Sequence, residues 1–119
     1  MRKSGAEITM VELVVIPKIE EVKTLLQEGK LEDAKDIIVR DILGLIIPYK
    51  EAQRETYENV PENLKSAPNN VRMEEIINTF EEVIQILFDE STSKLYYVTE
   101  QDLDYVASKI QGIIQAFKG

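Results

Sequence analysis

The sequence predicts an all-α protein built as a four-helix bundle. Apolar residues recur three and four positions apart along most of the chain, and the segments that interrupt this spacing are rich in Gly, Pro and Asn. The 119 residues fit one domain, so we assign 1–119 to a single helical domain. Hydrophobic residues make up 44% of the chain, which suffices for a core at this length.

The last two helices are the clearest. Their apolar positions form one continuous face each, and asparagines or a threonine stand where a helix N-terminus needs a side-chain acceptor. Asn69 or Asn70 is the expected cap of the third helix, and Thr99 that of the fourth. Together with the first half, the spacing predicts helices over 7–28, 31–58, 70–89 and 99–117.

The first two helices each contain a proline, and we expect a kink at Pro17 and at Pro48. The ring of an internal proline collides with the carbonyl four residues earlier. For Pro48 that residue is Gly44, which gives the backbone room to bend. Residues 8–16 are rich in β-branched side chains, so a short strand is the alternative there. A strand without a visible partner is unstable, which favours the helix.

Two helices joined by a short linker tend to pack antiparallel, so the third and fourth helices should share a core. The centre of that core is predicted from the apolar positions that face inward on both helices. These are Phe80, Ile84, Leu87, Ile110, Ile114 and Phe117.

The composition argues against an enzyme. His and Cys are absent, which removes the commonest general base, the catalytic triads and most zinc sites. The pairs Glu20–Glu21, Glu74–Glu75 and Glu81–Glu82 could in principle hold magnesium, but they fall on the polar sides of their helices. We therefore predict no catalytic residues, no metal site and no cofactor.

Charge and hydropathy limit the partners. With 22 acidic and 14 basic residues the net charge is −8, which repels phosphate and argues against direct nucleic-acid binding. No apolar run is long enough for a membrane span, and Glu7 and Glu12 interrupt the N-terminal run that a secretory signal would need. We expect a cytoplasmic protein without membrane contact.

One stretch resembles a known group of proteins. The pattern Tyr57-x-Asn59-x-Pro61-Glu62-x-Leu64-x-Ser66 is followed by the acidic helix "EEIINTFEEVIQIL". Over residues 51–88 this resembles small uncharacterised helical proteins of phages and mobile elements of Gram-positive bacteria. The segment "DIIVRDILGLIIPYK" departs from that group, whose first helix is usually far more charged. The resemblance implies an origin and a helical hairpin, but no activity.

These observations favour a non-enzymatic helical protein–protein interaction module that self-associates. The segment 37–47 is apolar almost all round, so it is either central in the bundle or buried by a partner. We predict a homodimer through one ridge of residues spaced by four, with a glycine that permits close approach: Val39, Leu43, Gly44 and Ile47. The alternative is a phage-type inhibitor that blocks a basic host protein of nucleic-acid binding or defence by acidic mimicry or steric hindrance.

Overall fold

A computed structural model describes residues 10–89, 91–92, 94–95 and 98–118. The all-α, bundle-like architecture is confirmed, with helices close to the predicted ranges. The first helix is a π-helical turn followed by an α-helix, and the second is a long helix with a π-helical segment in its middle. The helical elements are η1 (Val11–Val15), α2 (Ile16–Gln27), α3 (Leu31–Ile37), η2 (Ile38–Leu43), α4 (Gly44–Glu58), η3 (Glu62–Leu64), α5 (Pro68–Leu87) and α6 (Glu100–Lys118).

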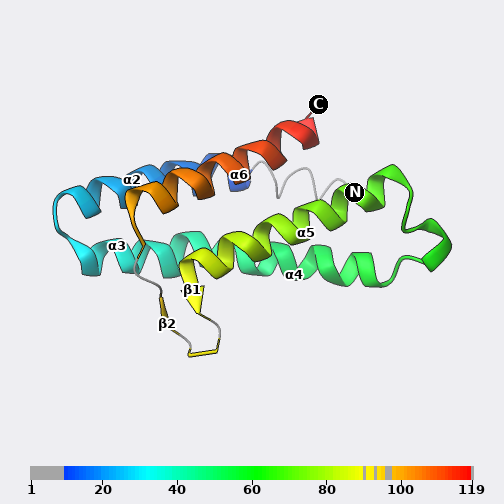
Figure 1. Ribbon diagram of the computed structural model, residues 1–119, viewed down its shortest axis with the longest axis horizontal. Coiled ribbons are helices and arrows are strands. Elements are labelled where there is room, and N and C mark those ends of the chain that lie inside the picture. The colour runs from blue at the N-terminus through cyan, green and yellow to red at the C-terminus, as the bar shows by residue number, and fades with distance from the viewer. Residues whose placement is uncertain (1–9, 90, 93, 96–97, 119) are drawn as a thin grey trace.

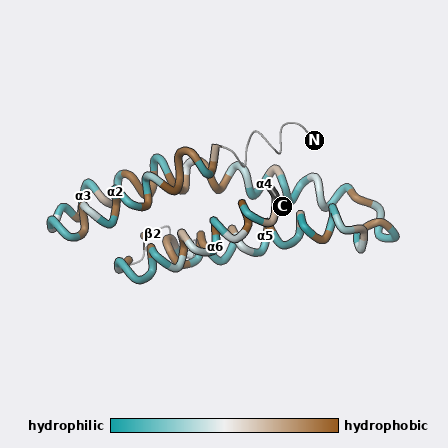
Figure 2. The backbone as a smooth tube through the Cα atoms, turned by 90° about the horizontal axis from the view of Figure 1, so that it is seen from above, coloured by the Kyte–Doolittle hydropathy of each residue, from teal (hydrophilic) through white to brown (hydrophobic). Residues whose placement is uncertain are grey.

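The helices run alternately up and down in two layers. One layer holds η1–α2 and the long helix α3–η2–α4, and the other holds α5 and α6 (Figures 1 and 2). A Gly29 with φ of 76° turns the chain between α2 and α3, a conformation that only glycine adopts easily. The long helix packs against α2 along its first half and against α5 along its second half. It therefore borders two neighbours, which explains why segment 37–47 is so apolar.

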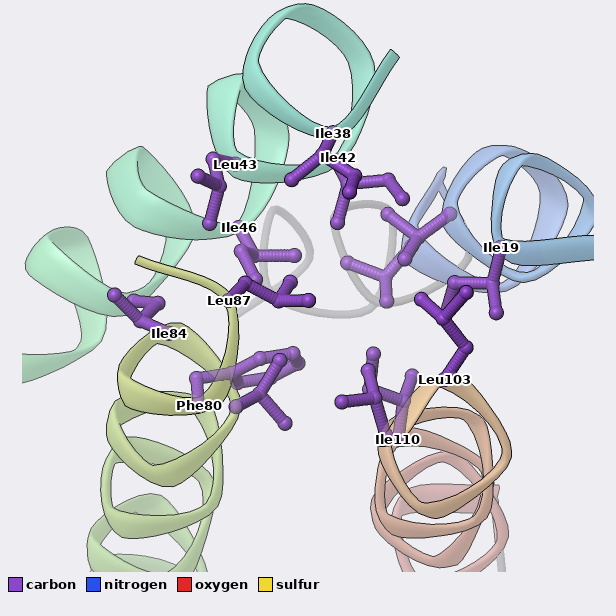
Figure 3. Packing of buried hydrophobic residues seen from close by; sticks show 14 of the residues in the cluster. Ile19, Ile38, Ile42, Leu43, Ile46, Phe80, Ile84, Leu87, Leu103 and Ile110 are labelled. Atoms are coloured by element: carbon purple, nitrogen blue, oxygen red, sulfur yellow. The ribbon is translucent and has the colours of Figure 1, made fainter. Parts of the chain in front are cut away.

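All four helices contribute to one buried core. Phe80 and Leu87 extend from α5 toward the interior that Ile110 of α6 also lines, with Ile42 and Ile46 above them (Figure 3). Ile84 lies on the side of α5 that faces α4 (Figure 3). The ring of Tyr49 meets the ring of Phe80 edge to face, with centroids 5.5 Å apart. Of the six predicted core residues, Phe80, Ile84, Leu87, Ile110 and Ile114 lie in this cluster. The side chain of Phe117 lies outside the described residues.

The predicted kinks at Pro17 and Pro48 are not confirmed. Both prolines lie within helices, and the irregular turns are instead the π-helical segments η1 and η2 upstream of them. In η2 the backbone N–H of Gly44 donates to the carbonyl of Val39, five residues back. The strand alternative is wrong for residues 11–16, which are helical; the earlier residues of that range, 8 and 9, lie outside the described part.

The caps and linkers differ in part from the prediction. Thr99 does cap α6: its hydroxyl accepts from the amide of Asp102 (3.1 Å), and the Asp102 carboxylate accepts from the amide of Thr99 (3.0 Å). The third helix begins earlier, at Pro68, and the Asn70 side chain donates to the carbonyl of Leu64 (2.7 Å) instead of capping the helix. The same helix ends at Leu87, where a small antiparallel hairpin follows: β1 (Phe88–Asp89) and β2 (Lys94–Leu95).

One end of the molecule is a two-helix extension without a core. The end of α4, the crossover with η3 and the start of α5 reach beyond α2 and α6 (Figure 1). We call residues 54–75 the arm; none of them is buried. Leu64 is 49% exposed because the other two helices do not extend over the crossover.

Candidate docking surface on α4

The polar cleft between α4, α5 and the β1–β2 hairpin is occupied by its own charges. It has a volume of about 710 Å³ and contains Lys50, whose side chain is 9% exposed. The Lys50 ammonium lies 2.7 Å from the carboxylate of Glu51 and holds the pKa of that carboxyl below its usual value. Arg54 forms an ion pair with Glu81 on the opposite wall. The cations of this cleft are thus already matched to carboxylates of the same chain.

Members of the pairs Glu74–Glu75 and Glu81–Glu82 contact neighbouring helices, whereas Glu20 and Glu21 pair with lysines of their own helix. The hydroxyl of Tyr57 donates to Glu74 (3.3 Å) between α4 and α5, and that of Tyr105 donates to Glu82 (2.6 Å) between α6 and α5. Lys23 of α2 meets Asp104 of α6 at 2.5 Å. Among the described residues no group of three acidic side chains is arranged for a metal ion. The contacts of Glu74, Glu82 and Asp104 thus join neighbouring helices.

A different surface, on the outer side of α4, is apolar. Because η2 is π-helical, the residue aligned with Val39 on the next turn is Gly44, five positions on. From Gly44 the regular α-helix continues the line through Pro48 and Ala52, four positions apart. All four residues are exposed, and Val39 is 51% exposed. The result is a low, exposed ridge along the helix.

An apolar groove runs beside this ridge. Leu45, Pro48 and Ala52 form one wall, and Met10 at the start of the first helix forms the other. The groove has a volume of about 340 Å³, and Met10 is 49% exposed at its edge. Tyr49 lies at its base. We call the surface formed by the ridge and the groove walls the α4 face: Met10, Val39, Gly44, Leu45, Pro48 and Ala52.

The structure corrects the predicted interface at Leu43. That residue is 4% exposed and lies in the core next to Ile42, so it cannot contribute to a surface shared with another chain. Ile47 is half-buried and packs against the core. The prediction assumed α-helical spacing of four from Val39, but the wider π turn moves the outward line one residue further along. Gly44 takes the place of Leu43 on the ridge, and Pro48 that of Ile47.

The sequence prediction did not include Met10, Pro48 or Ala52 in this surface. The sequence predicts Pro48 only as the site of a kink. A signal for the ridge was present in Gly44, Pro48 and Ala52, which are small and spaced by four. No signal indicated that the start of the first helix would lie beside them, because that depends on how the helices pack.

Comparisons with protein-family models, with curated proteins and with solved structures give no match for this chain. The similarity to phage and mobile-element proteins therefore stays a prediction. Among the described residues no helix is both long and apolar enough to cross a lipid bilayer.

Proposed function

We propose that the protein is a non-enzymatic helical interaction module that binds other protein surfaces through the α4 face. The observation that carries this proposal is the exposed apolar groove between Met10 and Ala52, next to a ridge with Val39 half exposed. Contiguous apolar surface on a small protein is a feature of binding sites. The polar cleft supports the same conclusion, because its charges are used within the chain.

The shape of the α4 face suits a helix as the docking element. Gly44 and Ala52 carry little side chain, so a second helix can approach the backbone closely along the ridge. The groove beside the ridge offers space for an apolar side chain of that helix, as in other helix-in-groove interactions. The half-buried wall residue Leu45 packs on the core beneath, which supports this wall of the groove in place before binding.

Site-specific photo-crosslinking tests this function. A photoreactive amino acid in place of Ala52, on the ridge, should give covalent protein adducts in cells that express the chain. The same amino acid in place of Ser108, on the exposed side of α6, is the matched control and should give none.

A second change shows whether the adducts depend on the apolar surface. Pro48→Glu places a charge on the ridge and restores a backbone N–H, so the helix should stay folded by circular dichroism. It should abolish the adducts formed from position 52. Equal cross-linking from positions 52 and 108, or adducts unaffected by Pro48→Glu, would contradict the proposal.

A further inference from the structure

We infer that the α4 face binds a second copy of this chain, with the two long helices antiparallel and the two-fold axis close to Pro48. This inference rests on the proposed function and names the partner of the same surface. A symmetric pair uses one patch on both chains, so the patch has to be complementary to itself. The α4 face meets that condition in shape, since Gly44 and Ala52 leave little side chain on either side of Pro48, and in charge, as follows from the residues at its two ends.

The first end of the ridge carries a cation. The Arg40 side chain is 70% exposed and donates from Nε and Nη2 to the carboxylate of Asp41, at 3.2 and 3.4 Å. A guanidinium has five N–H donors, so it can accept a second carboxylate. Asp41 is only 22% exposed and also meets Lys18 at 3.5 Å. The carboxylates of Asp41, Asp36 and Glu21 raise the pKa of this guanidinium. Of the Arg40–Asp41 pair, the guanidinium is the more exposed partner.

The opposite end of the ridge carries anions. Glu55 is exposed on the outer side of α4, beyond Ala52, and Glu51 is exposed one residue before Ala52. Glu51 is paired with Lys50 at 2.7 Å, so the carboxylate that this end offers to a partner is that of Glu55. The exposed guanidinium of Arg40 and the exposed carboxylate of Glu55 thus belong to residues about 22 Å apart along the helix.

This polarity selects the orientation of the second copy. In a parallel pair Arg40 would lie beside Arg40 and Glu55 beside Glu55, which is repulsive. In an antiparallel pair centred on Pro48, each Arg40 faces Glu55 of the second copy. The same axis places Gly44 opposite Ala52, so that small residues meet where the helices approach most closely.

One helix ridge and its groove form a small interface. Stable dimers usually bury more than about 1,200 Å², and weak, transient pairs bury less. We therefore expect a dissociation constant in the micromolar range, measurable by sedimentation equilibrium on the purified chain.

Cysteine pairing tests the orientation directly, because the natural chain has no Cys. Chains with Gly44→Cys are mixed with chains with Ala52→Cys under mild oxidation. A β-carbon at Gly44 meets only an ordinary contact, 3.4 Å from the carbonyl of Val39, so the substitution fits. The antiparallel pair gives the mixed disulfide 44–52 in excess over 44–44 and 52–52. Pro48→Cys alone should give a symmetric disulfide, and Leu64→Cys in the arm should give none.

Charge reversal gives an independent readout. Arg40→Glu places two carboxylates opposite each other at both ends of the interface and should weaken the dimer about tenfold. The combined chain Arg40→Glu with Glu55→Arg restores opposite charges and should recover wild-type dissociation. A double variant as weak as the single one would reject the pairing of Arg40 with Glu55.

The outcomes separate the inference from the proposed function. A wild-type chain that stays monomeric at several hundred micromolar, or same-position disulfides at 44 and 52, overturns the antiparallel second copy. If position 52 still cross-links other proteins in cells and Pro48→Glu abolishes this, the interaction module stands with a different partner. If neither the purified chain nor the cellular cross-link shows contact at Ala52, both are wrong.

Discussion

The two halves of the long helix α3–η2–α4 contrast with each other. Between Ile37 and Gln53 it buries side chains on two sides, because α2 lies along one side and α5 along the other. From Arg54 onward it belongs to the arm, where no residue is buried. The arm is held by individual polar contacts, such as Tyr57 to Glu74 (3.3 Å) and Lys65 over the ring of Tyr57 (4.9 Å).

The contrast shows what determines each half. A helix can continue into solvent on local preference alone, but apolar burial requires further helices beside it. In the bundle the packing is strong enough to hold a π-helical segment within the helix. In the arm, Leu64 and Val71 stay exposed because α2 and α6 do not reach far enough to cover them. We expect the two regions to respond differently to deletion, to cavity formation and to loss of a hydrogen bond.

The largest expected effect comes from deleting one residue of a regular helix. The buried residues of α5, such as Ile77 and Phe80, already have α-helical spacing. Deletion of the exposed Asn78 between them rotates the part of α5 after this position by about 100° relative to the part before it. The apolar residues of the two parts then face different directions, so the chain should lose its cooperative unfolding transition. Circular dichroism during thermal unfolding measures this.

Deletion of Arg40 from η2 is the matched comparison. Here the buried residues on either side, Ile38 and Leu43, are five apart, and removing one residue between them restores α-helical spacing. The exposed ion pair with Asp41 contributes little. We expect a folded chain whose free energy of unfolding lies within about 1 kcal/mol of wild type. If deletion of Arg40 abolishes the cooperative unfolding transition as deletion of Asn78 does, η2 does not contain an extra residue that the fold can lose.

The second expected effect is a cavity in the core. Phe80 is fully buried, and Phe80→Ala should lower the free energy of unfolding by about 3–5 kcal/mol in urea titration. Val71→Ala, at an exposed position of the arm on the same helix, should change it by less than about 0.5 kcal/mol. Similar losses for both variants would mean that the arm is packed as tightly as the bundle.

The sequence predicted the helices well because apolar spacing and caps are local signals. Thr99 and the acids after it placed the start of α6 correctly. The end of the third helix was predicted two residues late, because Phe88 fits the helical spacing. In the structure Asp89 instead accepts from the amide and hydroxyl of Ser91 (3.0 and 2.7 Å), which stabilises the turn of the hairpin.

The docking surface could be predicted only in part. Val39 and Gly44, which spacing alone assigns to the proposed surface, are exposed, whereas Leu43 is buried and Ile47 is half-buried. The sequence pattern does not show that the π-helical turn contains one extra residue. Segment 37–47 is so rich in apolar residues that every helical alignment would place apolar side chains toward the core. Only the packing of α2 and α5 on both sides of the helix selects which residues are buried, and that selection places the π turn in η2.

The smallest expected effect concerns a single hydrogen bond of the arm. The Asn70 side chain donates to the carbonyl of Leu64 and ties the crossover to the start of α5. Asn70→Ala should speed hydrogen exchange of the crossover amides roughly threefold to tenfold, because such a bond contributes about 0.5–1.5 kcal/mol. Asn63→Ala, at an exposed asparagine of the same crossover, should leave these rates unchanged.

The amides around Phe80 decide what this result means. They exchange only when the bundle opens, so their rates report global stability. If the arm opens by itself, Asn70→Ala leaves these slow rates as they are, since the folded bundle does not depend on the crossover. If the slow rates rise by the same factor as those of the crossover, arm and bundle unfold together. The arm would then unfold together with the bundle in spite of its weaker packing. The hydrogen bond from Asn70 to Leu64, although it lies outside the bundle, would contribute to the stability of the whole domain.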